Sequence, residues 1–522
     1  MNQTDENAMS DLSLGVPAHG TQAHSARLGP LSWLAIAVAA VLLGALIFHS
    51  FTAEHAAPPV DAHHGPPEGY APPPLWACVP FAGLLLCIAI LPLVPATAHW
   101  WESNKNRLIV ALAFGALAIL YYLLVHPMTV NHATHETYTG FASVVHVLEH
   151  AILGEYIPFI ILLFSLYVIS GGISLRGDLA AHPLTNTAFI GVGGVLASFI
   201  GTTGAAMLLI RPLLQTNAER RHVTHTAIFF IFVVCNCGGC LLPIGDPPLF
   251  LGYLMGVPFL WTFQLLVPWA VCCGALLAIY YLWDTVAYRK EEPRDIARDE
   301  TQRTPLRLRG KINLLYLLGV VLCVGLVKPG EPFPGLGFTA FPFLRELLML
   351  ALVALSLKST QSQIRKDNDF NYHAILEVAA LFIGIFIAMQ IPLEILNAKG
   401  PELGLTRPWH FFWATGSLSA FLDNAPTYVV FFTTAESLTH SAGQGILELA
   451  GGQFVREDLL VGISLGAVFM GAMSYIGNRP NFMVKSIAEQ SGIRMPSFFG
   501  YMLYSCVILL PLFAVITLIF VH

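Results

Sequence analysis

The chain has 522 residues, of which Lys, Arg, Asp and Glu make up 11% and hydrophobic residues 55%, with a mean hydropathy of +0.66. Soluble domains carry about 25% charged residues. This composition therefore excludes an ordinary water-soluble fold and indicates that much of the protein surface faces a lipid bilayer. The formal net charge of −6 gives no support for a nucleic-acid partner.

Residues 1–74 are expected to hold a polar tail, the first transmembrane helix and an external linker. About 30 mostly polar residues precede the apolar run at 31–50, and they are too many and too acidic for the start of a signal peptide. The segment 51–76 is rich in Pro and His and has no Lys or Arg, which favours an external position. We interpret it as a solvated linker, with weak metal binding as the alternative for His55, His63 and His64.

Eleven apolar runs approach the length of about 20 residues that a helix needs to cross the hydrocarbon core. Two further apolar stretches, 186–214 and 410–437, are interrupted by small and polar residues, and neither has the pattern of a single crossing. The expected spans are 31–50, 75–95, 107–126, 157–175, 226–255, 259–285, 312–328, 342–358, 374–392, 458–484 and 498–521.

The placement of Lys and Arg sets the orientation, because positive charge stays in cytoplasmic loops. The loop 286–311 has eight such residues and is expected inside, whereas 127–155 has none and is expected outside. The alternation is consistent only if 186–214 enters and leaves from the cytoplasm and 410–437 enters and leaves from outside. The sequence therefore predicts an all-α polytopic membrane protein with about 11 transmembrane helices, two re-entrant hairpins and a cytoplasmic N-terminus.

The segments 75–285 and 312–522 repeat one pattern on either side of the basic loop. In each, the hairpin is followed by an apolar span, 226–255 or 458–484, that is broken at Ile-Gly-Asp/Asn-x-Pro. The two segments are expected to run in opposite directions, so they form an inverted-topology repeat, the layout of many secondary transporters. A single break is often an ordinary Gly or Pro kink. Two matched breaks, each preceded by a hairpin, favour a binding site instead.

At these motifs the sequence resembles the ion transporter superfamily, which includes NhaD-type sodium/proton antiporters, arsenite permeases and citrate or dicarboxylate carriers. The resemblance covers roughly 150–520 and is strongest to the antiporter branch and its citrate-transport relatives. It rests on 236–246 (NCGGCLLPIGD), 419–424 (SAFLDN) and 471–478 (GAMSYIGN). It implies a homodimer, alternating access, and cation-binding roles for Asn236, Asp246, Ser419, Asn424 and Asn478. The antiporters carry paired acidic residues where this chain has Gly201-Thr202, which weakens the inference of proton antiport.

Ionisable side chains inside spans are costly and mark functional sites, and Asp246 is the foremost candidate. A carboxylate there binds either Na⁺ or H⁺; the alternative is a structural cap of the broken helix. Asp423 at the second hairpin tip has the same two interpretations, and Glu155 is either a proton-uptake group or an interfacial charge. The expected ion- or substrate-binding residues are Thr202, Thr203, Asn236, Asp246, Ser419, Asp423, Asn424, Ser474 and Asn478, with Asp246, Asp423 and Glu155 as proton-coupling groups.

Arg211 and Arg479 are cations in apolar surroundings. We expect them to pair with Asp246 or Asp423, and binding of an organic anion is the alternative.

Two motifs have the spacing of metal ligands. The segment His146-Val-Leu-Glu149-His150 matches the H-x-x-E-H pattern of some zinc peptidases, but no third ligand is evident and we expect an amphipathic interfacial segment. Three cysteines at 235, 237 and 240 are expected to be small, closely packed side chains. We therefore predict no resident metal, no cofactor and no enzymatic activity.

The sequence leaves two functions open. The leading expectation is Na⁺/H⁺ antiport across the inner (cytoplasmic) membrane, with Asp246 and Asp423 linking cation binding to protonation. The alternative is a cation-coupled carrier of citrate or another organic anion, in which Thr202, Thr203, Asn424 and Arg479 hold carboxylates beside Na⁺. We find no nucleotide-binding loop in the sequence, so ATP drive is not expected.

Overall fold

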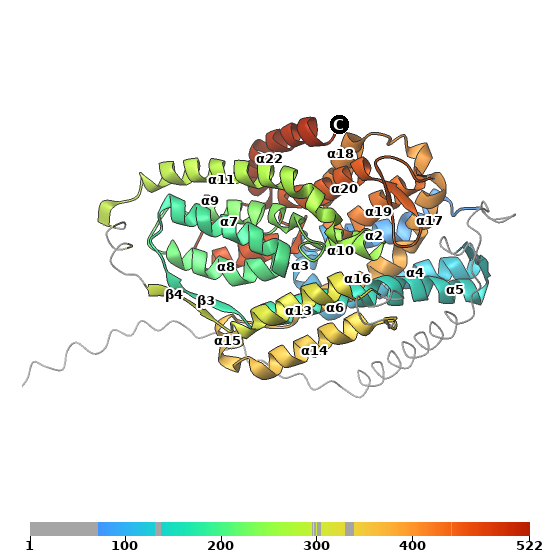
Figure 1. Cartoon of the computed structure of the whole chain (residues 1–522), viewed down its shortest axis with the longest axis horizontal. Helices are drawn as coiled ribbons and strands as arrows, with labels where there is room; N and C mark the ends of the chain where they lie inside the picture. The colour runs from blue at the N-terminus through green and yellow to red at the C-terminus, as the bar shows by residue number, and fades with distance from the viewer. Residues whose placement is uncertain are drawn as a thin grey trace, which may run out of the picture. The chain divides into compact units, whose positions relative to one another are not determined.

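The computed structural model describes residues 71–130, 137–294, 296, 299, 304–328, 339–439 and 441–522. All of them belong to one compact unit, 58–522. The polar tail, the expected first span at 31–50, and His55, His63 and His64 lie outside the described residues. The described residues are mostly helical (Figure 1).

The helices up to the basic loop are η1 (Leu75–Cys78), α2 (Val79–Ile90), α3 (Pro95–Trp101), α4 (Asn104–Leu124), α5 (Phe141–Leu148), η2 (Glu149–Tyr156), α6 (Ile157–Ser170), α7 (Pro183–Ile200), α8 (Thr202–Thr216), α9 (Thr224–Val233), η3 (Cys237–Cys240), α10 (Pro247–Leu254), η4 (Phe259–Leu265) and α11 (Leu266–Tyr288). After that loop come α13 (Ile312–Leu326), α14 (Leu344–Ser359), α15 (Ser362–Asp367), α16 (His373–Ala388), α17 (Gln390–Lys399), η5 (Gly400–Leu403), α18 (Pro408–Ser419), α19 (Asn424–Ser437), α20 (Glu457–Met470), η6 (Gly471–Met473), α21 (Arg479–Gln490) and α22 (Phe498–Phe520).

In the described ranges of the chain, three short antiparallel strand pairs accompany the helices. They are β1 (Met128–Val130) with β2 (Thr137–Thr139), β3 (Ser174–Asp178) with β4 (Thr304–Arg309), and β5 (Ile446–Glu448) with β6 (Phe454–Arg456). The pair β3–β4 joins the end of α6 to the basic loop, which the sequence pattern did not predict.

Of the helices in the described residues, five are long and apolar enough to cross a membrane, and up to seven spans result if each of two bent helix pairs counts as one. The bent pairs are Leu75–Ile90 with Pro95–Trp101, bent by 101°, and His373–Ala388 with Gln390–Leu403, bent by 40°. These helices make the chain a multi-pass membrane protein. The number is below the expected eleven because 31–50 lies outside the described residues and because breaks and short helices divide several other apolar runs. The run 226–255 becomes α9, η3 and α10, and α13 has only 15 residues.

The segment 127–155 differs most from its expected form as an external loop. Most of it is helical, because α5, η2 and α6 follow one another without a gap and form a candidate span of 30 residues, Phe141–Ser170. Several His and Glu side chains lower its hydropathy, which hid the first half of this helix in the sequence pattern. The middle part, η2, is π-helical and lies directly before Pro158, which has no N–H to donate. Such π-helical turns are frequent at functional sites.

Two helical hairpins lie at the expected stretches, and each is followed by a broken helix. Gly201 alone, at φ 78°, separates α7 from α8, and residues 420–423 separate α18 from α19. The helices of each hairpin pack together, and α21 packs against α8 while α10 packs against α19. Each broken helix therefore contacts the hairpin of the other segment. By length and composition alone, α7 also qualifies as a candidate span.

The glycines of the two breaks serve close packing. A Cβ added at Gly245 would lie 2.3 Å from the carbonyl oxygen of Gly239, and one added at Gly477 would lie 2.6 Å from that of Gly471. Neither Gly245 nor Gly477 is among the residues with positive φ. No side chain therefore fits between the crossing segments at these two positions.

Candidate functional site

Three of the expected binding residues donate hydrogen bonds to the carboxylate of Asp246. The Thr202 hydroxyl donates to Oδ1 at 3.0 Å, Asn478 Nδ2 donates to the same oxygen at 3.1 Å, and Asn424 Nδ2 donates to Oδ2 at 2.6 Å. Asp246 is 1% exposed, and the three donors are also buried. The four residues come from both hairpins and both broken helices, and Asp246 and Asn478 alone are 232 positions apart in the chain.

Four helix N-termini meet at this carboxylate. Thr202 and Asn424 are the first residues of α8 and α19, whereas Asp246 and Asn478 are the N-caps of α10 and α21. The backbone angles of the two N-caps nearly coincide, with φ −141° and ψ 143° for Asp246 and φ −147° and ψ 139° for Asn478. Helix N-termini carry partial positive charge and unpaired N–H groups. The arrangement therefore stabilises a negative charge, on Asp246 itself or on a bound anion.

Two buried asparagine oxygens beside these helix ends have no hydrogen-bond partner among the described residues. They are Oδ1 of Asn236 and Oδ1 of Asn424, and both residues are 0% exposed. An unsatisfied buried acceptor costs about 1–3 kcal/mol. Carboxylate and amide oxygens are ligands of hard cations such as Na⁺. The donor set therefore fits a cation that binds as cargo or as a coupling ion.

Asn481 belongs to the same network, although sequence reasoning did not include it among the site residues. Its Oδ1 accepts a hydrogen bond from Asn236 Nδ2 at 2.8 Å, and its Nδ2 donates to the carbonyls of Gly471 and Ser474 at 2.9 Å. Asn481 thus fixes the position of the Asn236 side chain. It also links α21 to the backbone of Gly471 and Ser474, which precede that helix. The feature of the sequence that could have identified Asn481 is its position one residue after Pro480, in the first turn of the helix that Asn478 caps.

Ser419 and Ser474 bind backbone groups. The Ser419 hydroxyl donates to the Ala467 carbonyl at 2.7 Å, and the Ser474 hydroxyl donates to the carbonyl of Ala420. Both residues are fully buried. They fasten the second hairpin to the second broken helix, and in these positions their hydroxyls do not contact Asp246.

Asp423 and Thr203 lie beside the Asp246 site, but within the described residues neither side chain forms a hydrogen bond with that carboxylate. Asp423 caps α19 through the Ala425 N–H, and its other oxygen accepts from Arg479 Nε at 3.2 Å. Arg479 also lies over the Phe382 ring, 4.8 Å from its centroid. This pairing was expected, whereas Arg211 contacts Asp369 at a more exposed position. The side chain of Thr203 is half-buried.

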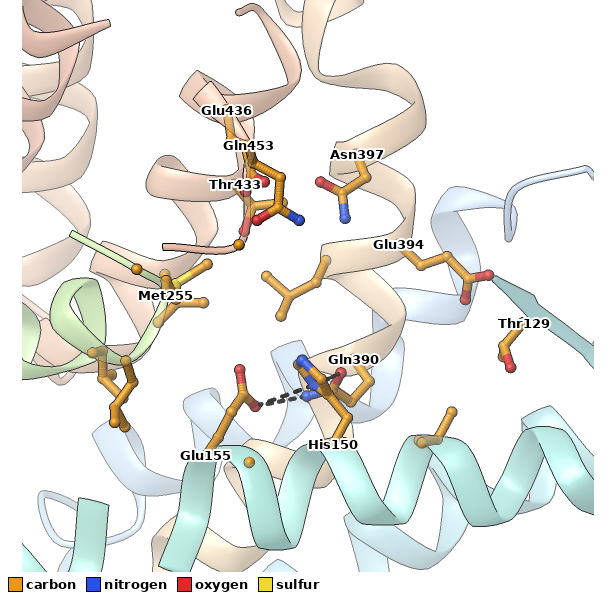
Figure 2. Close-up of a pocket in the computed structure, with 18 of the residues that line it drawn as sticks. Thr129, His150, Glu155, Met255, Gln390, Glu394, Asn397, Thr433, Glu436 and Gln453 are labelled. Carbon is orange, nitrogen blue, oxygen red and sulfur yellow. Dashed lines mark hydrogen bonds and ion pairs between the residues drawn. The ribbon is translucent and has the colours of Figure 1, made fainter. Parts of the chain in front are cut away.

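Glu155 lies in a different place, at a cavity of about 480 Å³ (Figure 2). Its Oε2 accepts from Gln390 Nε2 at 2.8 Å and lies 4.0 Å from His150 Nδ1. The residue is 8% exposed and lies within the π-helical part of a continuous helix rather than at the start of a helix.

The motifs with metal-like spacing do not assemble a metal centre in the described part of the chain. No group of three or more His, Cys, Asp or Glu side chains there could hold a metal ion. His146 stacks on Tyr138 with ring centroids 4.3 Å apart, and His150 binds Gln390. The motif cysteines are buried, as expected, and Cys237 Sγ lies 3.9 Å from Cys272 Sγ.

The fold and this site define a class, the multi-pass membrane transport proteins with broken helices around a buried ionisable residue. Residues 71–521 match the family described as "Putative citrate transport", and the chain belongs to this family. The match covers most of the chain and supports a secondary transporter rather than an enzyme. The expected similarity to citrate-transport proteins is thus confirmed, whereas sodium/proton antiport stays a prediction. No curated protein matches the chain.

Proposed function

We propose that the protein is a cation-coupled secondary transporter of citrate or another organic carboxylate. The observation that carries this proposal is the convergence of Thr202, Asn424 and Asn478 on the carboxylate of Asp246. The family match supports the organic anion over simple cation exchange.

The site offers separate features for an anion and for a cation. The four helix N-termini and the Thr202 hydroxyl suit a substrate carboxylate. The Asp246 carboxylate, with the unpartnered Oδ1 atoms of Asn236 and Asn424, suits Na⁺ or H⁺. A bound cation neutralises Asp246, so the substrate carboxylate meets the helix ends without a fixed negative charge beside it. This gives a physical reason for coupling: the anion binds well only after the cation.

The finer topology is also a proposal. It keeps about eleven spans, with 75–285 and 312–522 as inverted repeats, 286–311 as the cytoplasmic loop, and 186–214 and 410–437 as re-entrant hairpins. The protein is then a homodimer in the inner (cytoplasmic) membrane with a cytoplasmic N-terminus. Alternating access separates the hairpin tips from the broken helices in turn, and the bonds that hold Asp246 break and re-form.

Substitution of Asp246 tests the proposed function. We expect Na⁺-dependent uptake of labelled citrate by proteoliposomes of the wild-type chain, and loss of at least about tenfold of this uptake, about 1.4 kcal/mol, in Asp246→Asn. The amide keeps the shape of the side chain but cannot hold a proton or neutralise a cation. A suitable control is Asp369→Asn, because Asp369 is exposed and at φ 47°, a backbone conformation that Asn also adopts.

Full uptake by folded Asp246→Asn protein would refute the role of this carboxylate. Absence of citrate uptake in the wild type, with other carboxylates also inactive, would refute the substrate class.

Na⁺/H⁺ antiport is the second candidate, and one observation favours it. Arg479, the basic residue next to Asn478, forms an ion pair with Asp423, so its charge is already balanced for an organic anion, although its Nη1 has no hydrogen-bond partner among the described residues. In this mechanism Asp246, Asp423 and Glu155 couple the cation to protons. The measurement is the dissipation of a preset pH gradient by added Na⁺ in proteoliposomes without citrate.

A further inference from the structure

The cavity beside Glu155 is separate from the Asp246 site, but two helices connect them. Both α10 and α19 begin at the Asp246 site, and Leu251 and Leu254 of α10 and Val429 and Thr433 of α19 line the cavity. At 1.5 Å per residue, the eight residues of α10 place its far end roughly 12 Å from Asp246.

The lining of the cavity has a one-sided charge. Three carboxylates, those of Glu155, Glu394 and Glu436, line it together with the imidazoles of His146 and His150, and no Lys or Arg is among the described lining residues. In Figure 2, Glu155 and Gln390 lie on one side of the space, with Thr433 and Glu436 on the other. A cleft lined by one sign of charge concentrates ions of the opposite sign.

Several oxygens in this cavity lack a protein partner. Thr433 is 2% exposed, and its hydroxyl forms no hydrogen bond within the described ranges of the chain. Glu155 is 8% exposed. Its Oε2 accepts the hydrogen bond from Gln390, whereas its Oε1 points into the cavity (Figure 2). Buried polar atoms of this kind are normally satisfied by water or by a ligand. An ionised Glu155 oxygen only accepts, and the Thr433 hydroxyl can accept as well, so a cation suits the pair.

The helix ends add to the preference for positive charge. The C-termini of α10 and α19 reach the cavity through Leu254 and Glu436, and helix C-termini carry partial negative charge. The same two helices therefore present their positive ends to the Asp246 site and their negative ends to the cavity.

We propose that this cavity is an outer binding site for a hydrated monovalent cation, Na⁺, which occupies it before the ion reaches Asp246. The site keeps water on the ion, because the carboxylates are not grouped as metal ligands in the part of the chain described here. Glu155, Thr433 and Glu436 supply the oxygens that face the ion. A free polycarboxylate is disfavoured in the same space by the three glutamates. The order of events, in which the ion binds here before it reaches Asp246, rests on the proposed function. The existence of the binding site does not depend on it.

The test measures Na⁺ binding and transport separately on the full-length protein. Titration of the purified chain with Na⁺, followed by ²³Na line broadening, is expected to show two kinds of site in the wild type. Asp246→Asn should lose the inner site and keep the outer one. The double variant Glu155→Gln with Glu436→Gln, and separately Thr433→Val, should weaken the outer site and raise the Na⁺ concentration for half-maximal transport by roughly tenfold, with the maximal rate retained. Glu402→Gln, which removes one charge from an exposed position, is the matched control.

The outcomes separate the two proposals. If Asp246→Asn retains Na⁺ binding that the Glu155 and Glu436 variants remove, the outer site stands even when no citrate uptake is found. Unchanged Na⁺ titration and unchanged half-maximal concentration in folded outer-site variants would overturn it. Thr433→Val keeps the size of the side chain and the charge of the cavity, so it remains informative if the double variant does not fold.

Discussion

At the scale of single residues, Asn236 shows how a neutral side chain acquires a function from its surroundings. Its amide nitrogen is held by Ile231 and Asn481, which leaves Oδ1 buried and unpartnered in the described structure. The sequence motif identified Asn236 through family resemblance, but it gave no sign that Asn481 orients it. That relation depends on two segments 245 positions apart, and spacing along the chain does not report such contacts.

Gly471→Ala is expected to impair cation binding without removal of any ligand. A Cβ at Gly471 would lie 3.0 Å from Asn236 Oδ1, so the methyl group covers the oxygen that we assign to the cation. We expect the Na⁺ concentration for half-maximal uptake to rise about tenfold, equivalent to about 1.4 kcal/mol. The measurement is uptake against Na⁺ concentration in proteoliposomes.

The matched control for that substitution is Gly274→Ala in α11, where an added Cβ meets nothing within 4 Å. An unchanged Na⁺ dependence in Gly471→Ala would argue that Asn236 Oδ1 does not contact the ion.

At the scale of elements, hydrophobic patterning predicted the hairpin helices well, whereas the count of eleven spans is not confirmed. The tips and breaks carry Gly, Pro, Asp and Asn at fixed positions, so α7, α8, α18 and α19 begin and end within a few residues of the predicted stretches. Length counting fails where a helix contains polar residues for a site. Glu155 and His150 lie inside the helix that was expected to begin after them. The polar residues that a functional site needs therefore interrupt the hydrophobic pattern from which the helix is predicted.

Gly201→Ala tests how much the first hairpin depends on its tip. Gly201 has φ 78° and ψ 148°, a region that only glycine adopts readily, while an added Cβ would make only ordinary contacts at 3.6 Å. The substitution therefore introduces backbone strain without a clash, and we expect a loss of about 1–3 kcal/mol in stability. A lower midpoint of thermal unfolding in detergent would show this loss of stability, and Gly274→Ala again serves as the control. An unchanged midpoint would contradict the expected backbone strain at Gly201.

At the scale of the whole molecule, the site exists only because two distant segments of the chain meet. Thr202 and Asp246 precede the basic loop, whereas Asn424 and Asn478 follow it. The side chains of Thr202, Asn424 and Asn478 nevertheless all donate hydrogen bonds to the Asp246 carboxylate. The sequence predicted both sets from the repeated motif, since the same Ile-Gly-Asp/Asn-x-Pro break occurs twice. It did not predict which donor reaches which oxygen, because that depends on the crossing of α8, α10, α19 and α21.

Chemical labelling of single cysteines is expected to place both ends of the second hairpin on the outer face. Arg407 and Ser441 flank α18 and α19, and both are exposed. If 410–437 enters and leaves the membrane on one side, Arg407→Cys and Ser441→Cys will both react with a membrane-impermeant maleimide added to intact cells. Lys290→Cys, in the basic loop, will react only after the membrane is opened, because positive charge keeps that loop in the cytoplasm. The native cysteines are buried or half-buried, so a wild-type sample measures the background. Labelling of only one of the two hairpin positions from outside would mean a single crossing, and it would invert every span that follows.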